Sequence, residues 1–352
     1  MNKDNTKYVG IDLGDKTSLI QVRNGAGEFE KEMRIPTTTK AMEREFGRRE
    51  PMRIAIEVGG HSRWVSKMLR SCGHEVVVAN ACKLRLIYEN PRKSDRMDAE
   101  YLAKLLRLDA SLLSPVIHRE EETQQHLAIL RSRDSLVQTR TQLVNHVRGM
   151  VKNFGSRLPS CSTKSFARKA KPELPESLRP ALEPILESIQ DMSEHIQKYD
   201  REIEHLCQQV YPETANMRQI KGVGALTSLA YVLTLEDARR FHKSRDVGPY
   251  LGLVPRRNQS GDADPEGRIT KTGDKYLRCL LVGCAQYILG PFGEESHLRT
   301  WGLGMAESGG KRAKKRAVVA VARKLAVLLH KLWVSGQDYD PFYPAKSTQS
   351  LA

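Results

Sequence analysis

Four acidic residues in the first hundred positions have the types and spacing needed for metal-dependent chemistry: Asp12, Glu57, Asp95 and Asp98. Asp12 and Glu57 each follow a short apolar run, where a strand would end in a turn. Asp95 and Asp98 are three residues apart where a helix is expected to begin, which places them on one helical face. Because divalent cations of the hard class prefer oxygen ligands, the four carboxylates predict a cation site.

The charge of the chain indicates what such a site would act on. The 352 residues include 57 Lys and Arg against 42 Asp and Glu, a formal net charge of +15. Basic grooves gain affinity for phosphate backbones by releasing counterions, so we expect a nucleic-acid partner and a phosphodiester substrate. A merely basic, soluble surface is the alternative interpretation of composition alone.

Cysteine usage and hydropathy indicate the compartment. The six cysteines lack C-x-x-C spacing, which favours reduced thiols over disulfides or a zinc site. No basic run followed by an apolar stretch marks a signal peptide. The longest apolar run, residues 317–329, is interrupted by Arg323 and Lys324 and is too short to span a membrane. We therefore expect a cytoplasmic protein with no membrane partner.

The elements that must position the carboxylates lie in residues 1–115. Apolar alternation and turn signals predict strands at 8–12, 17–23, 28–35, 53–57 and 75–79, and helices at 40–48 and 61–72. A meander of strands followed by alternating helices predicts an α/β domain with a mixed sheet covered by helices.

The middle of the chain, residues 116–212, has a helical pattern. Apolar residues recur at helical spacing over 127–150 and again over 185–210, predicting two long helices. Between them, residues 156–184 are rich in Lys, Ser and Pro, which predicts a loop or hairpin tip. The segment is expected to form an antiparallel helical hairpin or coiled coil that serves as a spacer or dimerisation arm.

Residues 213–335 are expected to form a mainly α domain, followed by a tail over 336–352. Gly222 and Gly224 flank Val223 at the start of an apolar helix predicted over 226–235. Such a turn lets backbone amides approach a phosphate and resembles the hairpin of a helix-hairpin-helix DNA-binding motif. A turn that simply requires positive φ explains the glycines equally well.

A possible nucleophile lies farther along, in the polar, Gly-flanked loop around Ser260. A hydroxyl attacks only after losing its proton, and its target phosphate must be neutralised; Arg268, Lys271 and Lys275 follow the loop. Ser-Gly in a loop is most often only a turn, so the chemistry alone does not select Ser260.

The ordered set of motifs resembles the DEDD-type insertion-sequence transposases. It comprises the acidic quartet, Gly222-Val223-Gly224, and the pattern from Tyr250-Leu251-Gly252-Leu253-Val254-Pro255 through Ser260-Gly261 to Lys271-x-Gly273. The similarity extends to about Leu289. It implies an RNase H-like N-terminal domain, similar to Holliday-junction resolvases, joined by a coiled coil to a C-terminal transposase domain. Lys221 and Ala225 replace the usual prolines around Gly-x-Gly, and Pro249 replaces a small residue.

The resemblance also implies roles for particular residues. Asp12, Glu57, Asp95 and Asp98 would be catalytic and bind Mg²⁺, and Ser260 would attack a DNA phosphodiester covalently. The residues expected to contact nucleic acid are Gly222, Gly224, Arg268, Lys271 and Lys275. The implied partners are donor and target DNA, a structured non-coding guide RNA, and further copies of the chain, as a homodimer assembling to a homotetramer.

Other interpretations remain open at this point. A metal-dependent, junction-resolving endonuclease without a covalent serine step would use the same carboxylates but would leave residues 217–289 without a purpose. The segment around Asp12 also resembles the first phosphate loop of actin-like ATPases, but the second phosphate loop that such an enzyme needs is not found in the sequence. An architectural DNA-binding protein would explain only the charge. Arg131, Arg133, Arg140 and Arg148 would face the guide RNA or solvent, and residues 311–316 would contact nucleic acid or form a solvated charge run.

Overall fold

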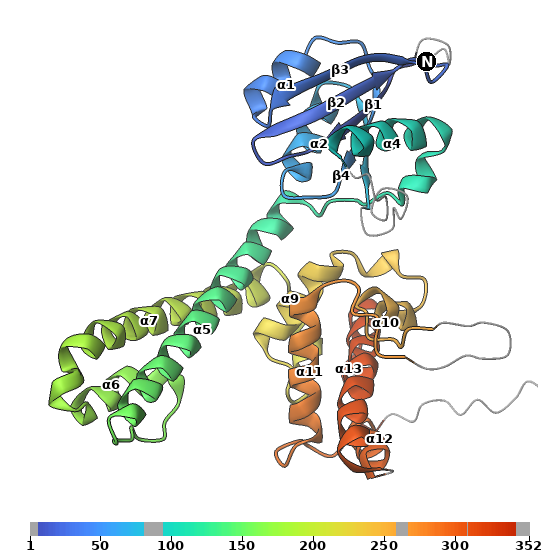
Figure 1. Ribbon diagram of the computed structural model, residues 1–352. Helices are drawn as coiled ribbons and strands as arrows, with labels where there is room; N and C mark the ends of the chain where they lie inside the picture. The colour runs from blue at the N-terminus through green and yellow to red at the C-terminus, as the bar shows by residue number, and fades with distance from the viewer. Residues whose placement is uncertain (1–5, 81–93, 258–266, 308, 343–352) are drawn as a thin grey trace, which may run out of the picture. The chain divides into compact units, whose positions relative to one another are not determined.

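A computed structural model describes residues 6–80, 94–257, 267–307 and 309–342 (Figure 1). The chain divides into two compact units, Met1–Arg119 and Glu120–Ala352. Each unit has its own hydrophobic core. No helix within the described ranges is long and apolar enough to cross a membrane.

The first unit is built on a five-stranded mixed sheet with the strand order β3-β2-β1-β4-β5. The strands are β1 (Tyr8–Asp12), β2 (Thr17–Arg23), β3 (Phe29–Pro36), β4 (Arg53–Glu57) and β5 (Glu75–Ala79). β1, β4 and β5 run parallel, whereas β2 pairs antiparallel with both β1 and β3. The mixed α/β organisation predicted from the sequence is confirmed.

Helices cover both faces of this sheet (Figure 1). Successive side chains of a strand point to opposite faces, so Val9 and Ile11 face one way and Gly10 the other. Val9 and Ile11 pack with α1 (Thr39–Phe46) and α2 (Ser62–Ser71). The opposite face packs against α4 (Asp95–Leu108). The sheet therefore has an α1–α2 face and an α4 face.

Gly10 determines how closely α4 approaches the sheet. A Cβ atom at this position would lie 1.9 Å from the carbonyl oxygen of Ala99 and 2.8 Å from the amide nitrogen of Ala103. Both alanines are fully buried. The helix therefore rests directly on the backbone of β1, which only a residue without a side chain allows.

The second unit begins with a helical hairpin, here called the arm, formed by α5 (Glu121–Asn153), α7 (Arg179–Gln209) and the residues between them. The predicted loop over 156–184 differs from the structure. It contains the short helix α6 (Phe166–Ala170), and α7 begins at Arg179 rather than near 185. A separate buried core that includes Phe166, Leu174 and Leu182 holds this end of the arm together.

A helical bundle completes the second unit. Its helices are α8 (Thr214–Arg218), α9 (Ala225–Leu235), α10 (Val247–Tyr250), α11 (Lys275–Leu289), α12 (His297–Glu307) and α13 (Gly310–Ser335). Residues 227–235 of α9 are all buried, so this helix is central to the bundle. Tyr231 on α9 donates a hydrogen bond to the carbonyl oxygen of Ala326 on α13, 2.6 Å away.

Candidate active site and nucleic-acid interface

Asp12 and Glu57 lie side by side at one end of the sheet. Each is the last residue of its strand, and the two strands are parallel neighbours in which Ile11 is opposite Ile56. Side-chain alternation puts Asp12 on the same face as Gly10, and Glu57 on the same face as Ala55. That is the α4 face. Two of the four predicted carboxylates thus share one face and one edge of the sheet.

The first turn of α4 brings Asp95 and Asp98 to the same edge. Asp95 forms an ion pair with Arg34 on β3, in which a guanidinium nitrogen lies 3.1 Å from a carboxylate oxygen. At the other end of the helix, Arg107 donates a hydrogen bond to the carbonyl of Gly25, in the turn between β2 and β3. The direction of α4 is therefore fixed. Its N-terminal turn lies toward the end of β1 that carries Asp12.

The two helical carboxylates differ in burial, which their spacing did not predict. Asp98 is only 5% exposed. The Asp95 side chain is 57% exposed. We call the four carboxylates the acidic edge. Their oxygen donors suit a divalent cation. Among the described residues, however, no three His, Cys, Asp or Glu side chains are close enough to hold a metal ion.

His61 joins two loops at this edge. It is the N-cap residue of α2, just after β4, and its Nε2 atom lies 3.6 Å from Asp15 in the turn after β1. The Trp64 indole donates to His61 Nδ1 at 3.1 Å. Because Nδ1 accepts this bond, a neutral His61 carries its proton on Nε2, facing Asp15. The residue therefore has a structural contact on both ring nitrogens.

In the second unit, the two glycines of the hairpin before α9 have different surroundings. Gly222 has φ +96°, and a Cβ there would lie 2.7 Å from the Tyr287 ring. The turn interpretation therefore applies to Gly222. Gly224 is the N-cap residue of α9 and has no atom within 4 Å of its Cβ position. Open space in front of a helix N-terminus is what a phosphate needs to approach backbone amides.

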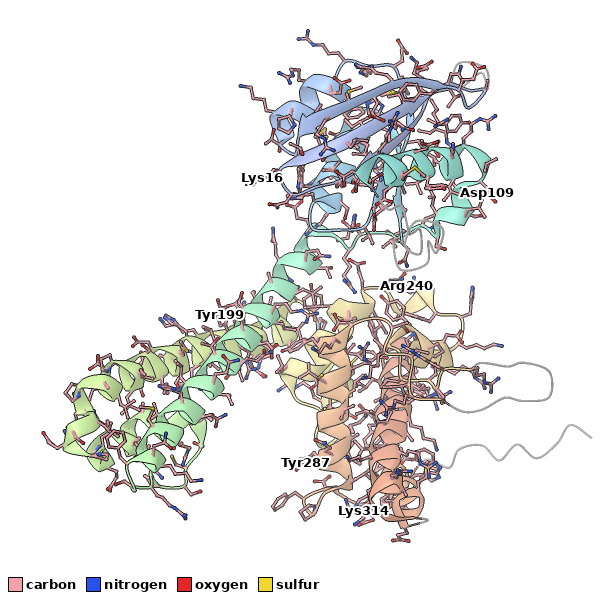
Figure 2. All side chains as sticks on the ribbon, in the orientation of Figure 1. Lys16, Asp109, Tyr199, Arg240, Tyr287 and Lys314 are labelled. Atoms are coloured by element: carbon pink, nitrogen blue, oxygen red, sulfur yellow. The ribbon has the colours of Figure 1, made fainter. Side chains whose placement is uncertain are left out.

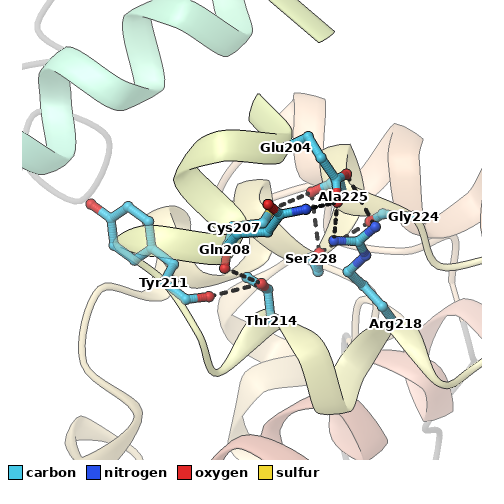
Figure 3. Close-up of polar contacts among 9 residues, drawn as sticks. All are labelled: Glu204, Cys207, Gln208, Tyr211, Thr214, Arg218, Gly224, Ala225 and Ser228. Carbon is cyan, nitrogen blue, oxygen red and sulfur yellow. Dashed lines mark hydrogen bonds and ion pairs between the residues drawn. The ribbon is translucent and has the colours of Figure 1, made fainter. Parts of the chain in front are cut away.

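The C-terminal end of α7 holds this hairpin in place (Figure 3). Arg218 donates two hydrogen bonds to the carboxylate of Glu204, at 2.8 and 3.0 Å, and this contact lowers the Glu204 pKa. The Cys207 thiol lies 3.6 Å from the carbonyl of Ala225. Ser228 donates back to the carbonyl of Gly224 at 3.1 Å. The position of the hairpin is therefore set by the arm as well as by α9.

Ser260 lies outside the described residues, but both of its flanks are described. Arg256 donates its amide to the carbonyl of Arg268 at 2.9 Å, and Pro255 forms an antiparallel bridge with Ile269. The amide of Thr270 donates to the carbonyl of Val254, also at 2.9 Å. This short ladder brings the two ends of the Ser260 segment together.

Just beyond the ladder, Gly252 and Gly273 each pack closely against the backbone of the opposite segment, which holds Lys271 in place. A Cβ on Gly252 would lie 2.3 Å from the carbonyl oxygen of Thr272, and one on Gly273 would lie 2.2 Å from that of Tyr250. Between them Lys271 adopts φ +57°, a conformation that costs a residue with a side chain roughly 1 kcal/mol. Strain of this kind often marks a functional position.

The three cations predicted to follow Ser260 are all exposed. Arg268 lies on the ladder, Lys271 follows it, and Lys275 is the first residue of α11. The backbones of Arg268 and Lys271 are held by main-chain hydrogen bonds to Arg256 and Gly252. All three follow the Ser260 segment along the chain, and their contact with phosphate remains a prediction.

Asp274, which was not singled out from the sequence, fixes the start of α11. Its side chain caps α11 by accepting the Leu277 amide at 2.7 Å, and it forms an ion pair with Arg131 on α5 at 2.5 Å. The Arg131 guanidinium stacks on the Tyr276 ring, 4.7 Å from its centre. Burial raises the pKa of Tyr276 to about 12. An Asp directly before an apolar helix was the available signal.

Two family models match the chain. One, described as a transposase and named for a DEDD motif, matches residues 9–155. The other, described as the transposase IS116/IS110/IS902 family, matches residues 214–298. The first contains the acidic edge, and the second contains the hairpin, the ladder and α11.

Several curated proteins are similar over most of their length. The probable family 20 transposase of Pseudomonas aeruginosa is 28% identical over 96% of this chain and 99% of its own. The putative transposase y4pF/y4sB of Sinorhizobium fredii is 26% identical over 95% and 86%, respectively. The transposase for insertion sequence element IS1111A of Coxiella burnetii is 29% identical over 72% and 70%.

The chain belongs to the IS110 family of insertion-sequence transposases. The family assignment made from the acidic quartet and the C-terminal motifs is thereby confirmed. It covers both units of the transposase.

Four arginines of the transposase arm contact protein groups, and Arg131 is also exposed. Arg131 pairs with Asp274, and Arg133 pairs with Asp200 on α7 at 2.5 Å. Arg140 is 8% exposed and donates to Ser193. Arg148 stacks on Phe166 and donates to the carbonyl of Pro159. Arg133, Arg140 and Arg148 therefore hold the arm together, whereas Arg131 ties it to the start of α11.

The basic run at 311–316 forms the start of α13, continuous with the apolar run after it. Ala313 and Ala317 are buried, while the side chains between and beside them are exposed: Arg312, Lys314, Lys315 and Arg316. Lys314 is labelled in Figure 2. Among the described residues these four cations form no ion pair. Contact with nucleic acid at this helix remains a prediction.

Proposed function

We propose that this transposase excises and inserts its own insertion sequence by forming a covalent bond between Ser260 and DNA. The observation that carries the proposal is the backbone ladder between residues 254–256 and 268–270. It holds both ends of the Ser260 segment beside Arg268 and Lys271. In our proposal these cations neutralise the phosphate that the hydroxyl attacks.

The proposed step conserves the number of phosphodiester bonds. Ser260 Oγ loses its proton and forms a bond to a scissile phosphorus, while the bond from that phosphorus to a deoxyribose oxygen breaks. The leaving oxygen takes up a proton and becomes a hydroxyl end. After strand exchange, a hydroxyl end attacks the phosphoserine, restores a DNA phosphodiester and returns the proton to Ser260. The cycle therefore needs no external energy source.

We assign the acidic edge to the same reaction. Asp12, Glu57, Asp95 and Asp98 supply oxygen donors on one face and edge of a sheet, in what we take to be an RNase H-like domain. Mg²⁺ held by these residues would supply positive charge to the phosphate oxygens. The residues themselves would contribute the carboxylate oxygens that a cation of this kind prefers.

Guidance by RNA and assembly of protomers complete the proposal. The net charge of +15 fits a complex that contains RNA as well as donor and target DNA. Gly224, Arg268, Lys271 and Lys275 are the proposed nucleic-acid contacts, whereas Gly222 is assigned to the turn before α9. In a homotetramer built from dimers, the acidic edge of one protomer would meet the Ser260 segment of another.

A covalent-adduct assay tests the function. The transposase is incubated with Mg²⁺, donor and target DNA, and the non-coding RNA from the end of its element. Adducts are then detected on denaturing gels. Ser260→Ala should abolish both adducts and recombination, whereas the matched exposed serine variant Ser160→Ala should retain them. Asp12→Asn should abolish cleavage, and RNase treatment should abolish target selection.

The rival function, a metal-dependent junction nuclease, gives a different result in the same assay. It requires Asp98 for cleavage but not Ser260, and it produces no adduct. Full recombination by Ser260→Ala would therefore reject the serine mechanism.

A further inference from the structure

The tip of the arm carries a concentration of positive charge that the proposed function does not use. From residue 135 to residue 172 the chain contains no Asp or Glu, but it contains eight Lys and Arg. Two of these, Arg140 and Arg148, are occupied by the Ser193, Pro159 and Phe166 contacts described above. The remaining six are exposed: Lys152, Arg157, Lys164, Arg168, Lys169 and Lys171. Over the described ranges, none of the six forms an ion pair.

The six cations stand on a folded support. Phe166, Ala167 and Ala170 of α6 are buried, so the exposed Arg168 and Lys169 project from the other side of the same helix. The buried side chains belong to a core shared by α5, α6 and α7 (Figure 1). A packed support fixes the backbone of a binding surface and lowers the entropy lost on binding.

An exposed aromatic residue lies at the same end of the arm. Phe154 follows the last residue of α5 and is 57% exposed. The next residue, Gly155, has φ +78° and turns the chain away from the helix. An aromatic side chain among cations is the combination on which unpaired bases stack.

We propose that the arm tip is a nucleic-acid binding surface. Lys152, Arg157, Lys164, Arg168, Lys169 and Lys171 contact the phosphate backbone, and Phe154 stacks on an unpaired base. This inference rests on the proposed function only in that the substrate complex contains DNA and RNA. It assigns to the arm a direct contact with one of these polyanions.

The alternative occupant is a second copy of the chain. Exposed acids on α7, including Glu187, Asp191 and Glu194, could face the tip of another arm. Protein interfaces are depleted in Lys at their centres, however, whereas phosphate contacts consist largely of Lys and Arg. Six exposed cations, followed along the chain by only two acids before α7, Glu173 and Glu176, therefore favour nucleic acid.

The test compares two triple variants of the full-length transposase. The tip variant is Lys164→Gln, Arg168→Gln, Lys169→Gln. The control, Lys40→Gln, Arg44→Gln, Arg48→Gln, removes the same charge from exposed positions on and beside α1. Dissociation constants are measured over a salt series with a duplex DNA and with the structured RNA of the element end. Each probe is scored separately, which identifies the polyanion that the tip holds.

For at least one probe, the tip variant should reduce the slope of log Kd against log salt by about two to three, because each lost phosphate contact removes about 0.9 for duplex or 0.7 for single strands. The control should keep the wild-type slope. Equal slopes for both variants with both probes would overturn the inference. So would a fall in oligomer mass in sedimentation, with binding per protomer unchanged, because this assigns the tip to a second copy.

Phe154→Ser, with the 79% exposed Phe292→Ser as its control, tests the stacking contact. Phe154→Ser should weaken binding of a single-stranded probe by about fivefold or more and leave duplex binding unchanged. Equal affinities for the two variants would remove the stacking contact. Adduct formation by the wild type is measured in parallel. Wild-type adducts with a normal tip variant reject only the arm-tip surface, whereas absence of wild-type adducts rejects the serine mechanism.

Discussion

The guanidinium of Arg34 on β3 lies 3.1 Å from the carboxylate of Asp95 on α4. In the sheet register, Arg34 is opposite Leu19 on β2, and Leu19 is opposite Asp12 on β1. Arg34, Leu19 and Asp12 therefore form one row across three strands. The ion pair ties the first turn of α4 to the row that contains Asp12, so the positions of Asp12 and Asp95 are coupled through the sheet.

Arg34→Ala should reduce DNA cleavage while leaving the stability of the first unit almost unchanged. Both partners are more than half exposed, so the free energy of unfolding should change by less than about 1 kcal/mol. DNA cleavage should fall by about tenfold or more, because Asp95 is no longer held at the acidic edge. Urea unfolding and a single-turnover cleavage assay measure the two effects. Arg96→Ala, which breaks the pair between Arg96 on α4 and Glu32 on β3, is the control. Equal cleavage by both variants would contradict the role of Arg34.

Gly10→Ala should destabilise the first unit strongly. The added methyl group would lie 1.9 Å from the Ala99 carbonyl oxygen, and α4 must move away from β1. Overpacking of this kind typically costs about 1–3 kcal/mol, and backbone contact places this site at the upper end. Gly59→Ala, which meets no atom within 4 Å, should change stability far less. Urea denaturation of the two variants side by side decides the matter, and similar midpoints would refute the close packing.

The two glycines of the hairpin should respond differently to alanine. Gly222→Ala places a side chain at φ +96° against Tyr287, so we expect a loss of about 1–3 kcal/mol in unfolding free energy. Gly224→Ala should cost less than about 1 kcal/mol. It should nevertheless weaken DNA binding several-fold, because the methyl group occupies the space that a phosphate would enter. Thermal unfolding and fluorescence anisotropy give the two readings; unchanged DNA affinity in Gly224→Ala would argue against the phosphate contact.

Lys271→Gly should increase stability and reduce activity. Glycine adopts φ +57° without steric cost, so the unfolding free energy should rise by up to about 1 kcal/mol relative to Lys271→Ala. Both variants lose the cation, so the salt slope for DNA binding should fall by about one in each. Calorimetry and a salt titration test the two statements. A Lys271→Gly variant with wild-type binding would exclude Lys271 from the interface.

His118 should make the first unit less stable in mild acid. Burial, with the charges of Arg70 and Arg63, lowers the pKa of His118 below its ordinary value of 6.5. The unfolded chain therefore takes up a proton at a pH where the folded chain does not. This contribution is complete above pH 6.5 and is lost as the pH falls through the folded-state pKa. Urea unfolding from about pH 7.5 to about pH 5.5 should show a smaller decrease for His118→Gln; equal decreases would place the titration elsewhere.

Much of the first unit could be predicted from sequence because its signals are local. Each strand is a short apolar run bounded by turn residues, and each predicted strand overlaps an observed one. The pairing of Asp95 with Arg34 could not be predicted, since it depends on which face of the sheet α4 covers. The packing of α4 on the sheet also determines that Asp98 is buried and Asp95 is exposed.

The arm tip shows why composition can mislead. Pro180 lies in the first turn of α7, where the missing N–H costs nothing, and Pro184 is tolerated within the helix. Their presence favoured a loop over these residues. The overlooked signal was the spacing of Leu178, Leu182, Leu186 and Ile189, which are all buried in the core of the tip. Helical periodicity was a better guide here than proline content.

The ladder beside the Ser260 segment is closed by main-chain hydrogen bonds, and the Arg256 guanidinium adds one long contact to the carbonyl of Thr270 at 3.5 Å. Because the main-chain bonds do not depend on side-chain identity, ladder residues such as Arg268 and Ile269 can be exchanged for other residues without changing how the two flanks meet. Mutation can therefore retune recognition at these positions while the framework that presents the segment is inherited unchanged. A mobile element that must adapt to new hosts gains from this separation of geometry and recognition.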